Sequence, residues 1–130
     1  MAIELGIMLT KNTEKYLDFE TCHPILRRLR EQGRKVVLCH GVFDLLHPGH
    51  IAHLEEAKAL GDILVVSITA APYVNRGPGR PIFSDDLRLY SLASITCVDY
   101  VLLAPVATAL EVLDRVQPDI YCKGHEYADY

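Results

Sequence analysis

Features of several protein classes are missing from this chain of 130 residues. No apolar run reaches the length that a membrane span needs, and no low-complexity segment or internal repeat is visible. The first residues lack the basic region and long apolar stretch of a secretory signal peptide. These absences predict that the chain has no membrane partner and that its location is cytoplasmic.

Basic charge is also scarce. Lys and Arg together number 13, Asp and Glu number 17, and the net charge is −4. A general nucleic-acid binder would present a basic surface, so we expect no nucleic-acid partner. Any site for an anionic ligand must therefore be local.

Cysteines are few, and those present form no close pair. Cys39 and Cys122 fall in apolar strand patterns. This pattern favours buried thiols in a reducing compartment over a disulfide framework. The four cysteines are Cys22, Cys39, Cys97 and Cys122.

What is present is the composition of one globular domain. Half of the residues are hydrophobic and 23 % are charged, which is ordinary for such a domain. By size scaling, the chain should bury roughly two-thirds of its unfolded surface. We expect a domain at 21–130, preceded by an N-terminal arm at 1–20 that shows no clear hydrophobic period.

The most informative stretch is residues 41–50, Gly-Val-Phe-Asp-Leu-Leu-His-Pro-Gly-His, which we call the histidine turn. An apolar run at 35–39 precedes it and predicts a buried strand. From Ile51 to Leu60, apolar residues recur on one helical face. The histidine turn is therefore predicted to join a strand to a helix, and such turns at the mouth of a parallel sheet bind ligands.

The residues of the histidine turn suit a phosphate group. The start of a helix has free backbone N–H groups, which favour an anion. His47 and His50 can donate from their rings, and Gly49 permits close approach of a phosphate to the backbone. Gly41 leaves room for a nucleotide, and Asp44 can hold a histidine tautomer or cap the loop.

A second candidate segment, residues 70–82, follows the next predicted strand, and we call it the arginine loop. Its three prolines and two glycines predict a loop. Arg76 and Arg80 flank the two glycines, and guanidinium groups beside exposed backbone N–H groups suit a polyphosphate. The alternative interpretation is a mobile basic loop.

Two further basic residues lie at predicted element ends. Arg88 falls in the first turns of a predicted helix that Ser84 caps, where a surface salt bridge is one interpretation. Lys123 ends a predicted strand, and α/β folds bind ligands at the carboxyl ends of their strands. The alternative for Lys123 is a lysine in solvent.

The remaining elements complete the pattern. Strands that alternate with helices imply right-handed crossovers and parallel pairing. We expect an α/β fold with a Rossmann-like doubly wound parallel sheet of at least four strands, in three layers with helices on both faces. The predicted helices are 21–32, 51–60, 84–95 and 108–117, and the predicted strands are 35–39, 62–69, 98–103 and 119–123.

The histidine turn resembles the HxGH signature of the cytidylyltransferase-like nucleotidyltransferases. The similarity extends from about Lys35 to Tyr127, in the family's order of segments. Gly-Pro-Gly-Arg-Pro in the arginine loop resembles heptose-phosphate adenylyltransferases, which usually carry a lysine at Arg76, and glycerol-3-phosphate cytidylyltransferases are also similar. The family's Lys-Gly-x-Asp-Tyr pattern matches at 123–127, with Glu126 in place of the aspartate.

The resemblance implies nucleotidyl transfer, in which an acceptor phosphate attacks the α-phosphate of a nucleoside triphosphate and pyrophosphate leaves. His47 and His50 would stabilise charge on the α-phosphoryl oxygens. Arg76, Arg80 and Arg88 would hold the β- and γ-phosphates, and Lys123 would orient the acceptor or bridge phosphates. Mg²⁺ would accompany the triphosphate, held mainly by substrate oxygens and water, with no metal site on the protein. The nucleotide-binding residues that the resemblance implies are Gly41, Val42, Phe43, Asp44, Gly49, Arg76, Arg80, Arg88 and Gly124.

The resemblance also suggests the substrates. His40 replaces an asparagine that is common in heptose adenylyltransferases, which favours CTP slightly over ATP. The acceptor is expected to be a sugar phosphate, an alcohol phosphate or a phosphonate, and AMP transfer from ATP to a heptose-type sugar phosphate is the alternative. Family members continue to a serine- and threonine-rich turn beyond the position of Tyr130. We therefore expect a domain cut from a longer chain, and leave open both a fused second enzymatic domain and a homodimer.

Two other classes of function stay open. Four histidines lie at 40–53, and histidines three residues apart on a helix can bind zinc in a hydrolase. A nucleotide-binding module without turnover would also show these motifs.

Overall fold

The structure, a computed structural model, describes residues 12–123 and arranges them around one five-stranded parallel sheet. The strand order is β1-β4-β3-β2-β5. All seven residues of β3 are buried, as its continuous apolar run predicts for a strand covered on both faces. The strands are β1 (Tyr16–Leu17), β2 (Val36–Gly41), β3 (Ile63–Thr69), β4 (Tyr100–Ala104) and β5 (Ile120–Tyr121).

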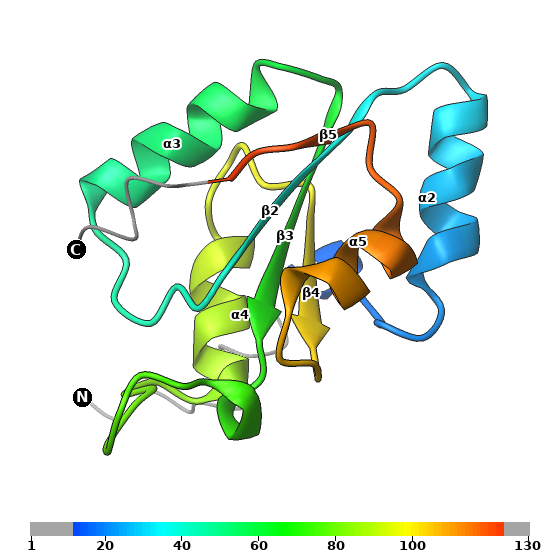
Figure 1. Cartoon of the computed structure of the whole chain (residues 1–130). Coiled ribbons are helices and arrows are strands. Elements are labelled where there is room, and N and C mark those ends of the chain that lie inside the picture. The colour runs from blue at the N-terminus through cyan, green and yellow to red at the C-terminus, as the bar shows by residue number, and fades with distance from the viewer. Residues whose placement is uncertain (1–11, 124–130) are drawn as a thin grey trace.

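Helices cover both faces of the sheet, as Figure 1 shows. On one face lie α3 (Pro48–Lys58) and α4 (Asp85–Ala93), and on the other lie α2 (Cys22–Glu31) and α5 (Ala109–Val116). Two short 3-10 turns complete the described chain, η1 (Thr13–Lys15) and η2 (Ala71–Tyr73). This arrangement confirms the predicted doubly wound α/β fold.

The core is divided by the sheet into two clusters, because successive side chains of a strand point to opposite faces. In β2, Val37 and Cys39 pack toward α3 and α4, whereas Val36 and Leu38 pack toward α2 and α5. Full burial of one such side chain contributes about 1.5–3 kcal/mol. The two clusters therefore hold the strands rigidly enough to position the loops that leave their carboxyl ends.

The order of the strands creates a switch point beside β2. The chain passes from β2 to β3 and β4 on one side, then returns to place β5 on the other side of β2. Ligands of doubly wound folds bind outside the carboxyl ends of the strands at such a point. The carboxyl end of β2, where the histidine turn begins, is therefore the expected position of a site.

Several details of the elements differ from the sequence predictions. α3 begins at Pro48, three residues before the predicted start, because the proline occupies the first helical position. The predicted strand at 119–123 is reduced to the two residues of β5. Ser84 caps α4 as predicted, accepting from the Leu87 N–H at 3.3 Å. Thr21 and Thr108 occupy the N-cap positions of α2 and α5, but neither side chain makes a cap hydrogen bond.

The first strand was not predicted. Tyr16 and Leu17 pair with Val101 and Leu102 at the edge of the sheet, so this part of the expected N-terminal arm belongs to the domain. The remainder of the arm, residues 1–11, lies outside the described residues. A strand of two residues is too short to show an alternating pattern.

No helix in the described part of the chain is long and apolar enough to span a membrane. The four cysteines are free thiols. Cys39 is buried, as its strand pattern predicts, but Cys122, the other cysteine in a predicted strand, is only half-buried because β5 is at the edge of the sheet. Cys22 is buried and Cys97 is half-buried.

Candidate functional site

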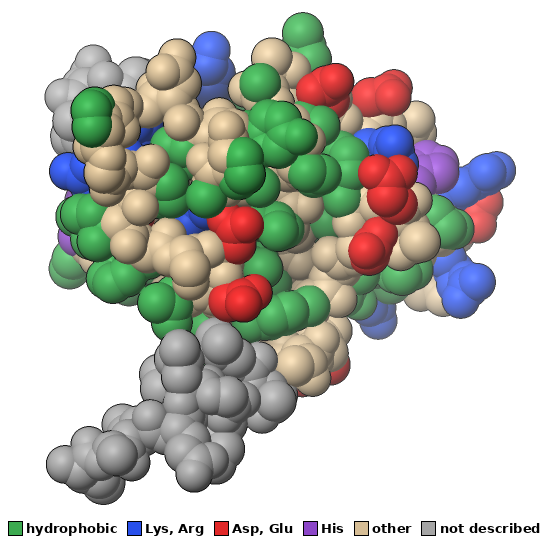
Figure 2. All heavy atoms as spheres, turned by 90° about the horizontal axis from the view of Figure 1, so that it is seen from below, with side chains coloured by type: hydrophobic (Ala, Val, Ile, Leu, Met, Phe, Trp, Pro, Cys, Tyr) green, Lys and Arg blue, Asp and Glu red, His purple; other side chains and the backbone are tan. Residues whose placement is uncertain are grey.

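The candidate site lies at the carboxyl edge of the sheet. Because all strand pairs are parallel, the histidine turn after β2 and the arginine loop after β3 leave the same edge. Figure 2 views the molecule from this side, and hydrophobic side chains cover much of the face, interrupted by Asp and Glu side chains. The face is not uniformly basic, so anion binding depends on a few positioned donors.

His47 and His50 come together at the start of α3. Their ring centroids are 3.9 Å apart. His47 is the N-cap residue, and its Nδ1 accepts from the Gly49 N–H at 3.0 Å. In return, the backbone N–H of His47 donates to Nδ1 of His50 at 3.2 Å. The two histidines thus form a reciprocal cap that satisfies two N–H groups of the helix start.

This cap determines where the ring protons lie. A ring nitrogen that accepts a backbone N–H carries no proton of its own. In their neutral forms, both His47 and His50 therefore hold their proton at Nε2, the nitrogen on the opposite side of the ring. Each ring thereby offers Nε2–H as a hydrogen-bond donor, which is the form that a phosphoryl oxygen requires.

The surroundings of His50 favour its neutral form. Burial lowers the pKa of His50, and the charges of His47 and His53 act in the same direction. The Phe43 ring meets the His50 ring edge-on, with centroids 6.1 Å apart. His50 is thus oriented by an aromatic contact and by its bond to the His47 backbone.

Phe43 itself has an unusual backbone. Its φ is +50°, a left-handed conformation that is rare for a bulky residue and is common at functional turns. The side chain is 8 % exposed and belongs to the core cluster beneath α3 and α4. A Cβ on Gly41 would lie 3.0 Å from this ring, so Gly41 makes room for Phe43, and the room that it is expected to leave for a nucleotide stays a prediction.

Gly49 has a comparable role beside His47. A Cβ at this position would lie 2.7 Å from Cε1 of the His47 ring, closer than side chains tolerate. Glycine therefore allows the ring to fold back onto the Gly49 N–H. The predicted approach of a phosphate to this backbone remains a prediction.

Asp44 joins the histidine turn to the arginine loop. One carboxylate oxygen accepts from the Phe83 N–H at 2.9 Å, and the other accepts from the Ile82 N–H at 2.7 Å and from Arg80 at 3.4 Å. Burial opposes ionisation, but these donors outweigh it and lower the pKa of Asp44. Asp44 therefore caps a loop, as one interpretation of the sequence proposed.

The two arginines of the arginine loop are both exposed. Arg80 lies against Asp44, and its side chain is 43 % exposed. Arg76 belongs to the same loop between β3 and α4. Both guanidinium groups are thus accessible to an anion at this edge.

Arg88 is not a surface residue: its side chain is fully buried. Its guanidinium donates to the backbone oxygens of Val42 at 3.0 Å, Thr69 at 2.8 Å and Phe83 at 3.1 Å. It also pairs with Asp85 at 2.5 Å. In this arrangement the group has no exposed surface for a phosphate, so its contacts do not favour the direct phosphate role that the resemblance implies.

His40 stands where heptose adenylyltransferases commonly carry an asparagine, and the expectation of CTP rests on this difference. Two hydroxyl groups hold its ring. Its Nδ1 lies 2.7 Å from Oγ of Ser67, and its Nε2 lies 3.3 Å from Oγ1 of Thr69. Burial lowers the pKa of His40. Because both ring nitrogens have hydroxyl partners, His40 provides a weak basis for selecting a nucleotide base.

Lys123 lies at the same edge beside β2. The Cys122 N–H donates to the Leu38 carbonyl at 2.9 Å, which continues the ladder beyond β5 and brings Lys123 to the carboxyl end. The lysine is exposed. Gly124, the other residue predicted here, lies outside the described residues.

The histidine cluster does not form a metal centre within residues 12–123. No three His, Cys, Asp or Glu side chains in this part of the chain converge as metal ligands. The described residues therefore give no support to the zinc hydrolase alternative.

Three residues of this edge were missed or assigned a different role from sequence. Sequence reasoning assigns Asp85 no contact with the arginine loop, but its carboxylate accepts the Ala71 N–H at 2.8 Å. The spacing of Asp85 and Arg88, three residues apart on a helix, is a signal that predicts their ion pair. Ile82 and Phe83 contribute only backbone N–H groups to Asp44, so their side chains carry no signal.

Comparison with known proteins adds to this description. A family model described as cytidylyltransferase-like matches residues 38–130. The chain is 40 % identical over 110 residues to the bifunctional protein HldE of Syntrophotalea carbinolica, covering 83 % of this chain and 22 % of the relative. It is also 40 % identical over 126 residues to the bifunctional protein HldE of Helicobacter pylori strain G27, covering 95 % of this chain and 27 % of that relative.

A solved structure is similar as well. It is the lipopolysaccharide core biosynthesis protein from Thermoplasma volcanium, with a TM-score of 0.62 and 38 % identity. The similarity covers 68 % of this chain and 73 % of the other. The chain thus spans about a quarter of the length of the curated relatives named above.

Proposed function

The chain belongs to the cytidylyltransferase-like family of nucleotidyltransferases, and on this premise we propose that it transfers AMP from ATP to a sugar phosphate and releases pyrophosphate. The observation that carries the proposal is the reciprocal cap of His47 and His50. It presents two Nε2–H donors at a helix start, beside the exposed arginines of the arginine loop.

The reaction forms one bond and breaks one. An oxygen of the acceptor phosphate attacks the α-phosphorus of the triphosphate, and the bond between that phosphorus and the oxygen leading to the β-phosphate breaks. Pyrophosphate leaves with this oxygen. Negative charge gathers on the α-phosphoryl oxygens in the transition state, and preorganised donors there stabilise it more than they stabilise the substrate.

Each part of the site has a role in this step. His47 and His50 donate from Nε2 to the α-phosphoryl oxygens. Arg76 and Arg80 hold the β- and γ-phosphates, and Lys123 orients the acceptor phosphate. No residue forms a covalent intermediate, because positioning and charge stabilisation are sufficient for this chemistry.

The nucleotide enters as its magnesium complex. Mg²⁺ retains waters and binds phosphate oxygens readily, so it needs no cage of protein ligands. Asp44 is the carboxylate nearest to the histidines in sequence, and its oxygens already accept three donors. We therefore assign the ion to the substrate and no ligand to the protein.

The choice of ATP follows from the relatives. The motifs of the arginine loop resemble heptose-phosphate adenylyltransferases, and the relatives at 40 % identity are named HldE. The structural neighbour is named for lipopolysaccharide core biosynthesis, which favours a sugar phosphate as the acceptor. CTP was favoured by His40 alone, and the bonds of His40 to Ser67 and Thr69 weaken that argument.

A substrate panel tests the proposal. Purified protein is incubated with ATP, CTP, GTP or UTP and magnesium, each with a set of sugar phosphates, glycerol phosphate and a phosphonate, and pyrophosphate is measured. We expect release that requires both ATP and a sugar phosphate. Release with CTP and glycerol phosphate alone would support the alternative donor, and no release with any pair would favour a module without turnover.

A further inference from the structure

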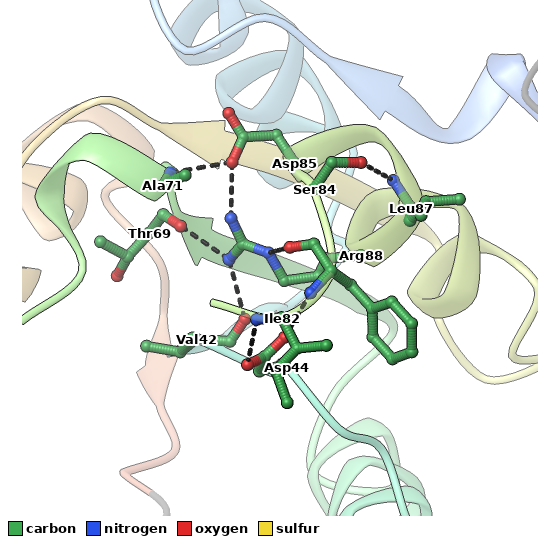
Figure 3. Close-up of polar contacts among 10 residues, drawn as sticks. Val42, Asp44, Thr69, Ala71, Ile82, Ser84, Asp85, Leu87 and Arg88 are labelled. Carbon is green, nitrogen blue, oxygen red and sulfur yellow. Dashed lines mark hydrogen bonds and ion pairs between the residues drawn. The ribbon is translucent and has the colours of Figure 1, made fainter. Parts of the chain in front are cut away.

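Two polar contacts join the histidine turn to the arginine loop, and Figure 3 shows them side by side. The first is Asp44, which binds the end of the arginine loop through the N–H groups of Ile82 and Phe83. The second is the ion pair on α4 between buried Arg88 and half-buried Asp85, which reaches the turn at Val42 and the loop at Ala71. The sequence leaves a loop cap open for Asp44 and a salt bridge open for Arg88, but it does not identify the backbone partners of either residue, and neither contact requires a ligand.

The Arg88 contact gathers chain segments that are distant in sequence. Its guanidinium donates to Val42 within the histidine turn, to Thr69 at the end of β3, and to Phe83 just after the arginine loop. Asp85, its partner, accepts the N–H of Ala71 near the start of the loop. Both ends of the loop are therefore fastened to the same buried group.

The Asp44 contact acts nearer to the candidate phosphate site. Asp44 lies three residues before His47, and its partners lie 38 and 39 residues further along the chain. The side chains of Ile82 and Phe83 are exposed, at 55 % and 41 %. Little apolar packing therefore holds this part of the loop, and the Asp44 carboxylate binds it directly to the turn.

We propose that Asp44 is a positioning residue that fixes the arginine loop against the histidine turn, with the Arg88–Asp85 pair holding the ends of the loop. This inference rests on the proposed function for its consequence, because the loop carries the arginines that would hold the outer phosphates. In this role Asp44 acts through Arg80 and the backbone at Ile82 and Phe83, and the role requires no contact between Asp44 and the nucleotide.

Amide hydrogen exchange tests the fastening without any substrate. In Asp44→Ala, the N–H groups of Ile82 and Phe83 lose their acceptor and should exchange at least about tenfold faster, the scale for losing one hydrogen bond to a charged group. Asp119→Asn is the matched control, because Asp119 accepts the Val36 N–H at 2.7 Å at the opposite end of the sheet. It should leave the exchange of Ile82 and Phe83 unchanged.

A double-mutant cycle tests whether Asp44 acts through the loop. Affinity for ATP is measured by calorimetry for wild type, Asp44→Ala, Arg80→Ala and the double variant. If Asp44 works by holding Arg80 in place, the two losses of affinity should not add. The double variant should then bind ATP about as weakly as whichever single variant binds ATP less tightly. If Asp44 instead had a purely structural role, the fold-losses in ATP affinity of the two single variants would multiply in the double variant. Asp85→Asn provides a second route to the same loop, and it should accelerate exchange of the Ala71 N–H.

The outcomes separate this inference from the proposed function. Unchanged exchange at Ile82 and Phe83 in Asp44→Ala, or multiplying losses in the cycle, would overturn the positioning role. Failure of the wild type to bind any nucleoside triphosphate would instead contradict the proposed function. In that case the exchange measurement alone decides whether Asp44 fastens the loop.

Discussion

The backbone N–H of His47 donates to Nδ1 of His50, so the second histidine of the turn binds the N-cap residue of its own helix. The bond connects the two residues that the proposed reaction needs most. Its geometry requires His50 to be unprotonated at Nδ1 and leaves the ring proton at Nε2. Several measurable consequences depend on this pair and its neighbours.

Loss of the His50 ring should remove one transition-state donor. We expect His50→Ala to fold and to reduce turnover roughly a hundredfold or more, the scale for one such donor. The measurement is pyrophosphate release at saturating substrates. His53→Ala, one turn further along α3, is the control and should turn over normally. Equal turnover of His50→Ala and wild type would contradict the assigned role.

Gly49 should be required for the orientation of His47. An added Cβ would lie 2.7 Å from the His47 ring, and the exposed ring can turn away at little cost to the fold. Gly49→Ala should therefore keep its melting temperature within a few degrees and lose about tenfold or more in turnover, as for a misplaced catalytic group. A variant with normal turnover would show that the fold-back of His47 is dispensable.

Arg80 should discriminate between nucleotides by their number of phosphates. Arg80→Ala removes a donor that we assign to the outer phosphates. The substitution should therefore weaken the binding of ATP far more than the binding of AMP. Calorimetric titrations of both nucleotides into both proteins provide the comparison. Equal weakening of ATP and AMP would mean that the arginine loop does not contact the outer phosphates.

The stability of the fold should depend on pH through His50. Burial, reinforced by the charges of His47 and His53, lowers its pKa below the ordinary value of 6.5, so the unfolded chain binds a proton at a higher pH than the folded chain. The contribution of His50 to the free energy of unfolding is fully present above pH 6.5. It is lost progressively as the pH falls from 6.5 through the lowered pKa.

Urea unfolding at a series of pH values measures this dependence. His50→Asn lacks the titrating group and should lose less stability than wild type as the pH falls below 6.5. A nuclear magnetic resonance titration follows the His50 ring directly. A titration midpoint above 6.5 would show that the environment of His50 favours the charged form.

The buried arginine should matter for folding. Arg88→Ala leaves three backbone oxygens and the half-buried carboxylate of Asp85 without their donor, and an unsatisfied buried acceptor costs about 1–3 kcal/mol. Arg27→Ala is the matched control, because Arg27 pairs with Glu31 on the surface of α2, where such pairs contribute about 1 kcal/mol or less. Denaturant unfolding of both variants compares them. Similar small losses would show that Arg88 is not a structural centre.

The sequence alone predicts much of this molecule, and the exceptions have physical causes. β2 and β3 are predicted because continuous apolar runs fit a sheet covered on both faces. The histidine turn is predicted because its glycines, proline and helix-forming sequence are local signals. β1 is not predicted, because two residues show no period.

The contacts of the arginine loop are the part that sequence reasoning does not reach. Arg88 resembles a surface residue, since arginine is rarely buried without partners. Its partners here are mostly backbone oxygens, at Val42, Thr69 and Phe83, and backbone groups leave no trace in side-chain patterns. The same is true of the N–H groups that Asp44 accepts.

The most direct test of the central claim follows the α-phosphate. The protein is incubated with magnesium and a sugar phosphate, and with ATP labelled either at the α-phosphate or at the γ-phosphate. The account predicts that the α-label moves into a nucleotide-linked sugar and that the γ-label appears in pyrophosphate, with both transfers slowed roughly a hundredfold or more in His50→Ala. Transfer of the γ-label to the sugar, or release of the label as inorganic phosphate alone, would contradict it.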